Sequence, residues 1–137
     1  MRSCPSLCAV ENGQGDGILA AMKVRSARVS DAKAICSLIN YYAEHDKMLF
    51  RSLAEVYANL QTFLVAEKDH QLIGCCSLEV IWSDLAEGKS LAVGANSRGM
   101  GVGTALVCAA IEQARRLGVP RVFALTLEPK FFERVGF

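Results

Sequence analysis

Residues 96–104 read Asn96-Ser97-Arg98-Gly99-Met100-Gly101-Val102-Gly103-Thr104, with three glycines at every second position. Glycine allows the backbone to take positive φ and to approach a ligand closely. An apolar stripe of helical spacing follows this segment. The first N–H groups of such a helix have no partners within it and carry partial positive charge. The segment is therefore suited to binding a diphosphate, with Arg98 adding a fixed positive charge.

The glycine spacing excludes two common phosphate-binding motifs. A P-loop ends in Gly-Lys-Ser/Thr, and a dinucleotide-binding turn has the spacing G-x-G-x-x-G. The spacing here is G-x-G-x-G, without the lysine. The alternative at this point is a plain connection between a strand and a helix, made through a tight turn.

The sequence on either side of this segment predicts a strand, a helix and a second strand. The helix extends from about Gly101 to Leu117, and Gly118 and Pro120 end it. Its buried stripe is predicted to hold Val102, Leu106, Ala110, Ala114 and Leu117. The strands are predicted over Glu87–Val93, where Gly88 can mark a bulge, and over Arg121–Leu127. This order favours parallel strand pairing in an α/β fold with a mixed sheet.

The rest of the chain supplies further strands and short helices. Ser30 and Asp31 are capping residues for a helix with Ile35, Leu38, Ile39 and Tyr42 at helical spacing. Asp46–Arg51 is a loop with exposed apolar residues, and Ser52 caps a second helix whose apolar face holds Leu53, Val56, Tyr57 and Leu60. The other predicted elements are strands over Lys23–Val29, Phe63–Glu67 and Leu72–Ile81, the last two as a hairpin, and a final helix over Lys130–Val135.

The 137 residues suit one domain, predicted over residues 22–137. Residues 1–21 are predicted to be a flexible segment because Gly13, Gly15 and Gly17 alternate with polar residues, the alternative being a biological start at Met22. The formal net charge of +1 favours neither nucleic acid nor a membrane surface as a partner. Without a membrane-length apolar run or a readable targeting peptide, we expect a cytoplasmic protein.

Six cysteines give no paired C-x-x-C zinc signature, and His45 and His70 stand alone, so no metal site is predicted. Four of the cysteines lie in apolar segments, where cysteine behaves as a small hydrophobic residue. Cys75 and Cys76 have no evident histidine partner, which argues against a nucleophilic role.

Three segments together resemble the GNAT superfamily of N-acyltransferases. Arg98-Gly99-Met100-Gly101-Val102-Gly103 fits its R/Q-x-x-G-x-G/A motif, Leu91-Ala92-Val93 stands where that superfamily has the preceding strand, and residues 132–137 resemble the end of its last helix. More narrowly, the chain is similar to amino-acid N-acetyltransferases related to N-acetylglutamate synthase. The residues that carry this narrower resemblance are 48–52, 74–78, 86–87, 90–93, 124–126 and 131–132.

The resemblance implies acetyl-CoA as the co-substrate. It implies that backbone groups of Leu91, Ala92 and Val93 bind the pantetheine arm, and that one of their N–H groups polarises the thioester carbonyl. Loop amides from Gly99 to Thr104 would then hold the pyrophosphate beside Arg98. The expected cofactor-binding residues are thus Leu91, Ala92, Val93, Arg98, Gly99, Met100, Gly101, Val102, Gly103 and Thr104.

Glu87 is the candidate general base. Transfer to an amine requires a neutral nitrogen, so a nearby carboxylate must remove a proton directly or through water. The resemblance to histone acetyltransferases, with their glutamate four residues before the position of Leu91, favours Glu87. Strict alternation would place Glu87, Lys89, Leu91 and Val93 on one face of their strand, a register that Gly88 makes less certain. The alternative is a solvated charge at the start of a strand.

The acceptor side is less defined. By resemblance, Arg51 would bind a substrate carboxylate, with Lys89 and Arg121 as weaker candidates and a solvated surface arginine as the alternative. Many relatives use a tyrosine of the last helix as general acid, but this chain has Phe132 at that position. Tyr41, Tyr42 and Tyr57 are interpreted as core or rim residues.

The predicted function is transfer of an acetyl group to the primary amine of a small acceptor, such as glutamate, by direct attack. The alternative is a non-catalytic acyl-CoA-binding or regulatory domain. Relatives continue into one or two further strands, whereas this chain ends at Phe137. We therefore expect either a domain truncated at its C-terminus or a sheet edge that another subunit, as in a homodimer, completes.

Overall fold

The computed structural model describes residues 22–126 and 128–137. The segment 1–21, predicted to be flexible, lies outside the described residues, as does Leu127. The described chain forms one five-stranded sheet in the order β1-β2-β3-β4-β5. The strands are β1 Met22–Ser26, β2 Phe63–Lys68, β3 Gln71–Trp82, β4 Leu85–Val93 and β5 Arg121–Phe123. The first four strands pair antiparallel, and β5 pairs parallel to β4. The predicted mixed α/β sheet is confirmed.

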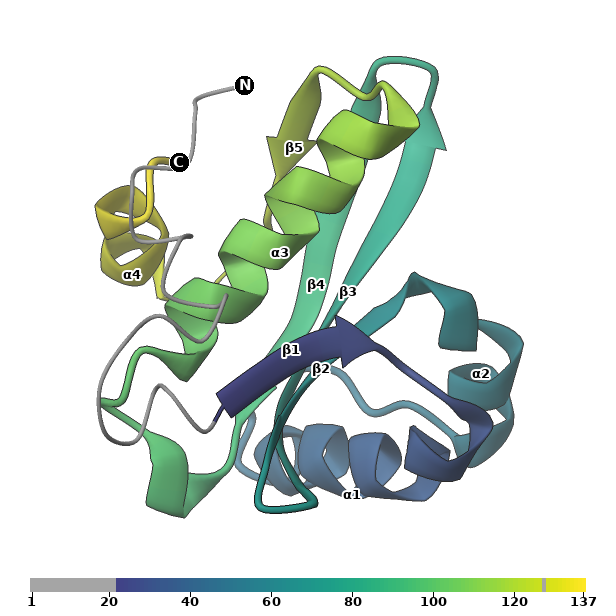
Figure 1. Cartoon of the computed structure of the whole chain (residues 1–137), viewed down its shortest axis with the longest axis vertical. Helices are drawn as coiled ribbons and strands as arrows, with labels where there is room; N and C mark the ends of the chain where they lie inside the picture. The colour runs from purple at the N-terminus through teal and green to yellow at the C-terminus, as the bar shows by residue number, and fades with distance from the viewer. Residues whose placement is uncertain (1–21, 127) are drawn as a thin grey trace.

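Helices cover both faces of this sheet (Figure 1). The helix α3, Val102–Leu117, packs on one face, where Leu106, Ala110 and Ala114 join a core cluster with the strands. The helices α1, Ala32–Ala43, and α2, Leu53–Ala58, pack on the other face around Phe63 and Val65. The last helix, α4, Pro129–Arg134, packs beside α3 through a third cluster that includes Val135.

Local sequence signals set the start of α2 and the end of α3 as predicted, whereas Ser30 and Asp31 lie in the 3-10 helix Val29–Asp31 and Asp31 makes no side-chain capping bond to α1. Ser52 accepts a hydrogen bond from the backbone N–H of Glu55 at 3.1 Å, and the Glu55 carboxylate accepts in return from Ser52 N–H. The helix α3 ends at Gly118, whose φ of +80° is left-handed. Within the described residues, no helix is long and apolar enough to cross a membrane.

Several predicted details are wrong. The first strand ends at Ser26 rather than at Val29, because Val29–Asp31 forms a 3-10 helix, and Leu60 lies in a 3-10 helix after α2 rather than on α2. Strand β5 is short: the segment 124–126, predicted as strand, does not pair with β4. Leu117 is 54% exposed rather than part of the buried stripe, because it lies in the last turn of α3. On α2 only Val56 is fully buried, whereas Leu53 and Tyr57 are exposed. For β5, the apolar pattern continues past the point where pairing with β4 ends.

The pairing of β4 changes along its length, and this creates the site. Strand β5 pairs with Leu85, Ala86 and Glu87, whereas β4 continues to Val93. Among the described residues, the later part of β4 therefore has a strand partner only on its β3 side. The other edge of that part faces α4 and the beginning of α3 across a pocket.

Candidate active site

The glycine segment forms a cradle at the beginning of α3. Gly99 and Gly101 both have left-handed φ, at +78° and +80°, and Gly101 is the N-cap of a helix of 16 residues. That cap has no side-chain hydrogen bond, so the first N–H groups of α3 are left for a ligand. A Cβ at Gly99 would have no atom within 4 Å, which shows open space above the loop. These features, with the exposed Arg98, fit a diphosphate.

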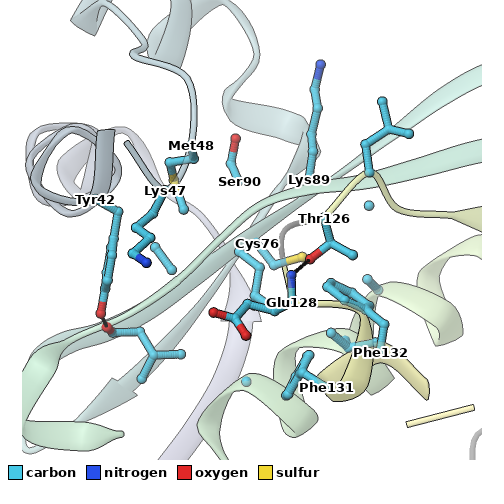
Figure 2. Close-up of a pocket in the computed structure, with 18 of the residues that line it drawn as sticks. Tyr42, Lys47, Met48, Cys76, Lys89, Ser90, Thr126, Glu128, Phe131 and Phe132 are labelled. Atoms are coloured by element: carbon cyan, nitrogen blue, oxygen red, sulfur yellow. Dashed lines mark hydrogen bonds between the residues drawn. The ribbon is translucent and has the colours of Figure 1, made fainter. Parts of the chain in front are cut away.

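One pocket connects this cradle with the open edge of β4. Its lining includes Arg98, Gly101 and Gly103 at the beginning of α3, and Leu91, Ala92 and Val93 on β4. Phe131 and Phe132 close it from α4, and the apolar loop between α1 and α2 lines its rim (Figure 2). All of the predicted cofactor-binding residues except Met100 thus line one pocket, and Met100 packs at the edge of the core beside the cradle.

A bulge in β4 overturns the predicted register. Cys75 pairs with Ala92 and Ser77 pairs with Lys89, so Ser90 and Leu91 together oppose Cys76. Ser90 has φ +55°, as a bulged residue can. Gly88, the predicted bulge position, pairs regularly with Leu78. The prediction of a bulge at Gly88 is therefore wrong, and the bulge of β4 lies at Ser90 and Leu91.

The bulge also separates residues that alternation would place on one face. Before it, Ala86 belongs to the α3 core, so Glu87 and Lys89 face α1 and α2. After it, Ala92 packs with α1, so Leu91 and Val93 face α3. The prediction that Glu87, Lys89, Leu91 and Val93 share a face is therefore wrong. Glu87 and Lys89 therefore lie on the α1 and α2 side of the sheet, whereas Leu91 and Val93 lie on the α3 side.

Glu87 lies in the pocket lining, where it pairs with Glu79 on β3 and with Phe123 on β5. Residues directly opposite in an antiparallel pair share a face, so two carboxylates stand side by side on the α1 and α2 side of the sheet. Glu79 was missed by sequence reasoning. The signal was present, because Cys75, Ser77 and Glu79 alternate on one face of β3.

Arg51 and Lys89 converge on Glu79. Arg51 Nη2 donates to Glu79 Oε2 at 3.0 Å, and Lys89 Nζ lies 3.0 Å from Glu79 Oε1. Burial alone would raise the pKa of Glu79, but hydrogen bonds from Lys89 and Arg51 outweigh it and hold that pKa below its ordinary value. We call these three residues the charge cluster. It brings together two of the three predicted carboxylate-binding residues.

The packing around Arg51 fixes its position. Its backbone N–H donates to Asn40 Oδ1 at 3.0 Å, and Asn40 Nδ2 donates to its carbonyl at 2.9 Å. Its guanidinium lies 5.3 Å from the centre of the Phe63 ring, and its side chain is only 11% exposed. These contacts exclude the alternative interpretation of Arg51 as a solvated surface arginine. Arg121, the third candidate, pairs with Asp84 away from this cluster.

Other reactive groups behave as the sequence suggested or were missed. Burial raises the pKa of the Cys76 thiol to about 12 and also raises the pKa of Cys75, so neither is a ready nucleophile. Phe132, which packs edge-on against Phe131, supplies no hydroxyl at this position of the last helix.

Glu128, missed by sequence reasoning, points its carboxylate into the pocket (Figure 2). Tyr42, interpreted as core or rim, lies in the pocket lining as well.

Known proteins share this architecture. The structure superposes with a TM-score of 0.79 on a Mycobacterium tuberculosis protein solved in complex with CoA, at 41% identity over 82% of this chain and 69% of that one. It superposes equally well, at 30% identity, on N-acetylglutamate synthase from Neisseria gonorrhoeae complexed with coenzyme A and N-acetyl-glutamate. That alignment covers 82% of this chain but 27% of the synthase.

The sequence comparisons agree with this architecture. An amino-acid acetyltransferase of Mycobacterium tuberculosis is 42% identical over 117 residues, which are 83% of this chain and 67% of the relative. Residues 30–137 match the sequence profile described as the Acetyltransferase (GNAT) family. This match covers the cradle, the bulged strand and the charge cluster. The resemblance read from the glycine segment is confirmed, and the chain belongs to the GNAT family of acetyltransferases.

Proposed function

We propose that this chain moves the acetyl group of acetyl-CoA to the primary amine of a small amino acid, such as glutamate, by direct attack. The observation that carries the proposal is the continuity of one pocket from the cradle at the beginning of α3 to the charge cluster on the opposite side of β4. An anionic cofactor and an acceptor with a carboxylate can therefore meet along one strand.

The cofactor side would be built from backbone groups. The N–H groups of the first turn of α3, with Arg98, would hold the pyrophosphate, and the open edge of β4 beyond Glu87 would hold the pantetheine arm. Acetyl-CoA supplies the activated thioester carbonyl. A backbone N–H of Leu91 or Val93 would stabilise the negative charge that develops on the carbonyl oxygen.

The acceptor side would be built from side chains. Arg51 and Lys89 would hold the acceptor carboxylates, because a guanidinium and an ammonium donate several hydrogen bonds to such groups. Glu87 would take the proton from the acceptor ammonium, directly or through water. The freed amine then attacks the carbonyl carbon, the C–S bond breaks, and the thiolate leaves, while the excess proton on the new amide nitrogen passes through water to the thiolate. The names of the similar proteins, an amino-acid acetyltransferase and N-acetylglutamate synthase, support this acceptor class.

The test is release of the CoA thiol from acetyl-CoA with a panel of amino acids, each compared with its decarboxylated amine. We expect release with glutamate or a similar amino acid and little with the matching amine, because decarboxylation removes the α-carboxylate, one of the groups that Arg51 and Lys89 would hold. Tight CoA binding without release for any acceptor would favour the alternative, a non-catalytic acyl-CoA-binding domain. A folded protein without CoA affinity would contradict both.

A further inference from the structure

Tyr42 connects two parts of the cofactor side from a helix that belongs to the other layer. It lies near the end of α1, and its hydroxyl donates to the backbone carbonyl of Val93, the last residue of β4 (Figure 2). Its ring also lies 6.0 Å from the Arg98 guanidinium. One side chain of α1 therefore contacts both the end of the bulged strand and the charged residue of the cradle.

The Val93 carbonyl that accepts this hydrogen bond points toward the open edge of β4. Gly94 N–H donates to the Ile73 carbonyl on β3 at 2.8 Å. In a trans peptide the carbonyl points opposite to the N–H of the following residue, so the Val93 carbonyl points away from β3. It therefore belongs to the open edge of β4, and the Tyr42 hydroxyl reaches that edge where β4 leads into the cradle.

The ring of Tyr42 also limits the freedom of the Arg98 side chain. Arg98 is exposed and extended, with φ −69° and ψ 146°, and stands at the end of the short turn Ala95–Ser97. A long exposed side chain loses rotamer freedom when it binds an anion, and this loss weakens binding. A guanidinium that already rests on an aromatic face has less freedom left to lose.

We infer that Tyr42 is a positioning residue for CoA, which fixes the end of β4 with its hydroxyl and supports Arg98 with its ring. This inference rests on the proposed function, because it requires that the diphosphate of CoA binds at the cradle. It assigns to α1, which otherwise packs on the acceptor side, a part in binding the cofactor. Tyr42 acts through Val93 and Arg98 and needs no contact with the reacting atoms.

Calorimetric CoA binding to Tyr42→Phe and Tyr42→Leu tests the inference. Tyr42→Phe keeps the ring and loses one hydrogen bond, so we expect roughly 3- to 10-fold weaker binding. Tyr42→Leu also removes the support of Arg98, and we expect about 10- to 50-fold weaker binding. Dephospho-CoA, which keeps the diphosphate, should show the same losses. At saturating acetyl-CoA, kcat should stay near that of the unmodified protein.

Tyr57→Phe is the matched control, because it removes the same hydroxyl from an exposed residue that does not line the pocket. Arg98→Gln changes an exposed residue and leaves the core intact, so it keeps the test open even if a Tyr42 variant does not fold. We expect Arg98→Gln to weaken CoA binding. When Tyr42→Leu is added to Arg98→Gln, we expect a smaller further loss of CoA affinity than Tyr42→Leu causes alone. Unchanged CoA affinity in folded Tyr42→Phe, or in Arg98→Gln, would overturn the inference, whereas absent CoA binding by the unmodified protein would instead overturn the proposed function.

Discussion

The two sides of β4 are built in different ways. On the cofactor side, the cradle consists of backbone N–H groups within one continuous segment, and left-handed glycines shape it. On the acceptor side, the charge cluster consists of side chains from the loop before α2, from β3 and from β4. A backbone site withstands changes in its side chains but not in its φ angles. A side-chain site depends on each residue separately and on pH.

The largest effect expected from this difference is on Glu87. Loss of a general base lowers turnover about 100-fold or more, so Glu87→Gln should do so while CoA affinity stays unchanged, because the cradle is made of backbone. Steady-state kinetics with the best acceptor and calorimetry with CoA measure the two quantities. Glu128→Gln is the rival variant, since Glu128 also points into the pocket. A large loss of turnover in Glu128→Gln, with none in Glu87→Gln, would mean that Glu128 and not Glu87 is the general base.

The second effect concerns the cradle itself. Gly101 has φ +80°, and a β-branched residue there is strained by about 1–3 kcal/mol, besides crowding the ligand. Gly101→Val should therefore weaken CoA binding by roughly 10- to 100-fold. Gly118→Val is the matched control, because Gly118 also has φ +80° but caps the far end of α3. If both variants weakened CoA binding equally, the loss would reflect strain in α3 and not the cradle.

The cradle could be predicted from the sequence because all of its determinants are contiguous. Glycine spacing, helical periodicity and the end at Gly118 together define the segment from Arg98 to Leu117, and no distant contact changes that prediction. The predicted strand–helix–strand unit follows from the same local signals. Within this unit the prediction was wrong for the length of β5, because pairing with β4 ends after Phe123 although the apolar pattern continues, for the burial of Leu117, and for the place of the bulge in β4.

The acceptor side could be predicted only in part, since its geometry depends on pairing between strands. Ser90 at φ +55° carries no signal as clear as a glycine, so alternation was extended through the bulge and put Leu91 on the wrong face. Arg51 and Glu79 are 28 residues apart, and only the packing of α1 on the sheet brings them together. The contact of Tyr42 could not be predicted from the sequence either, because its hydrogen-bond partner Val93 is 51 residues away.

A third prediction separates the two sides through Arg51. Arg51→Gln should raise the KM of the acceptor about 10-fold, because a charged hydrogen bond to a carboxylate contributes roughly 1.5–3 kcal/mol, part of which Lys89 retains. CoA affinity should stay the same, and the preference for an amino acid over its decarboxylated amine should fall. Arg115→Gln, which breaks an exposed pair with Glu112 on α3, should change neither quantity. An unaltered acceptor KM in Arg51→Gln would mean that Arg51 has only a structural role.

The smallest effect expected is on stability, and it tests whether Glu79 holds the charge cluster together before any acceptor arrives. Because the folded pKa of Glu79 lies below its ordinary value of 4.5, its ion pairs stabilise the fold fully above that pH. This contribution is lost as the pH falls through the folded pKa, where the carboxylate becomes protonated. Glu79→Gln should therefore lower the free energy of unfolding by about 1 kcal/mol at pH 7 and by progressively less below pH 4.5.

Urea denaturation of both proteins across this pH range measures that difference, with CoA affinity at pH 7 as the internal reference. The backbone cradle has no titrating group of its own, so Glu79→Gln should leave CoA binding intact at pH 7. A stability difference that did not shrink below pH 4.5 would mean that packing, and not the ion pairs with Arg51 and Lys89, accounts for the contribution of Glu79. In that case the two cations would be arranged by their own elements, and the acceptor side would be as preorganised as the cradle.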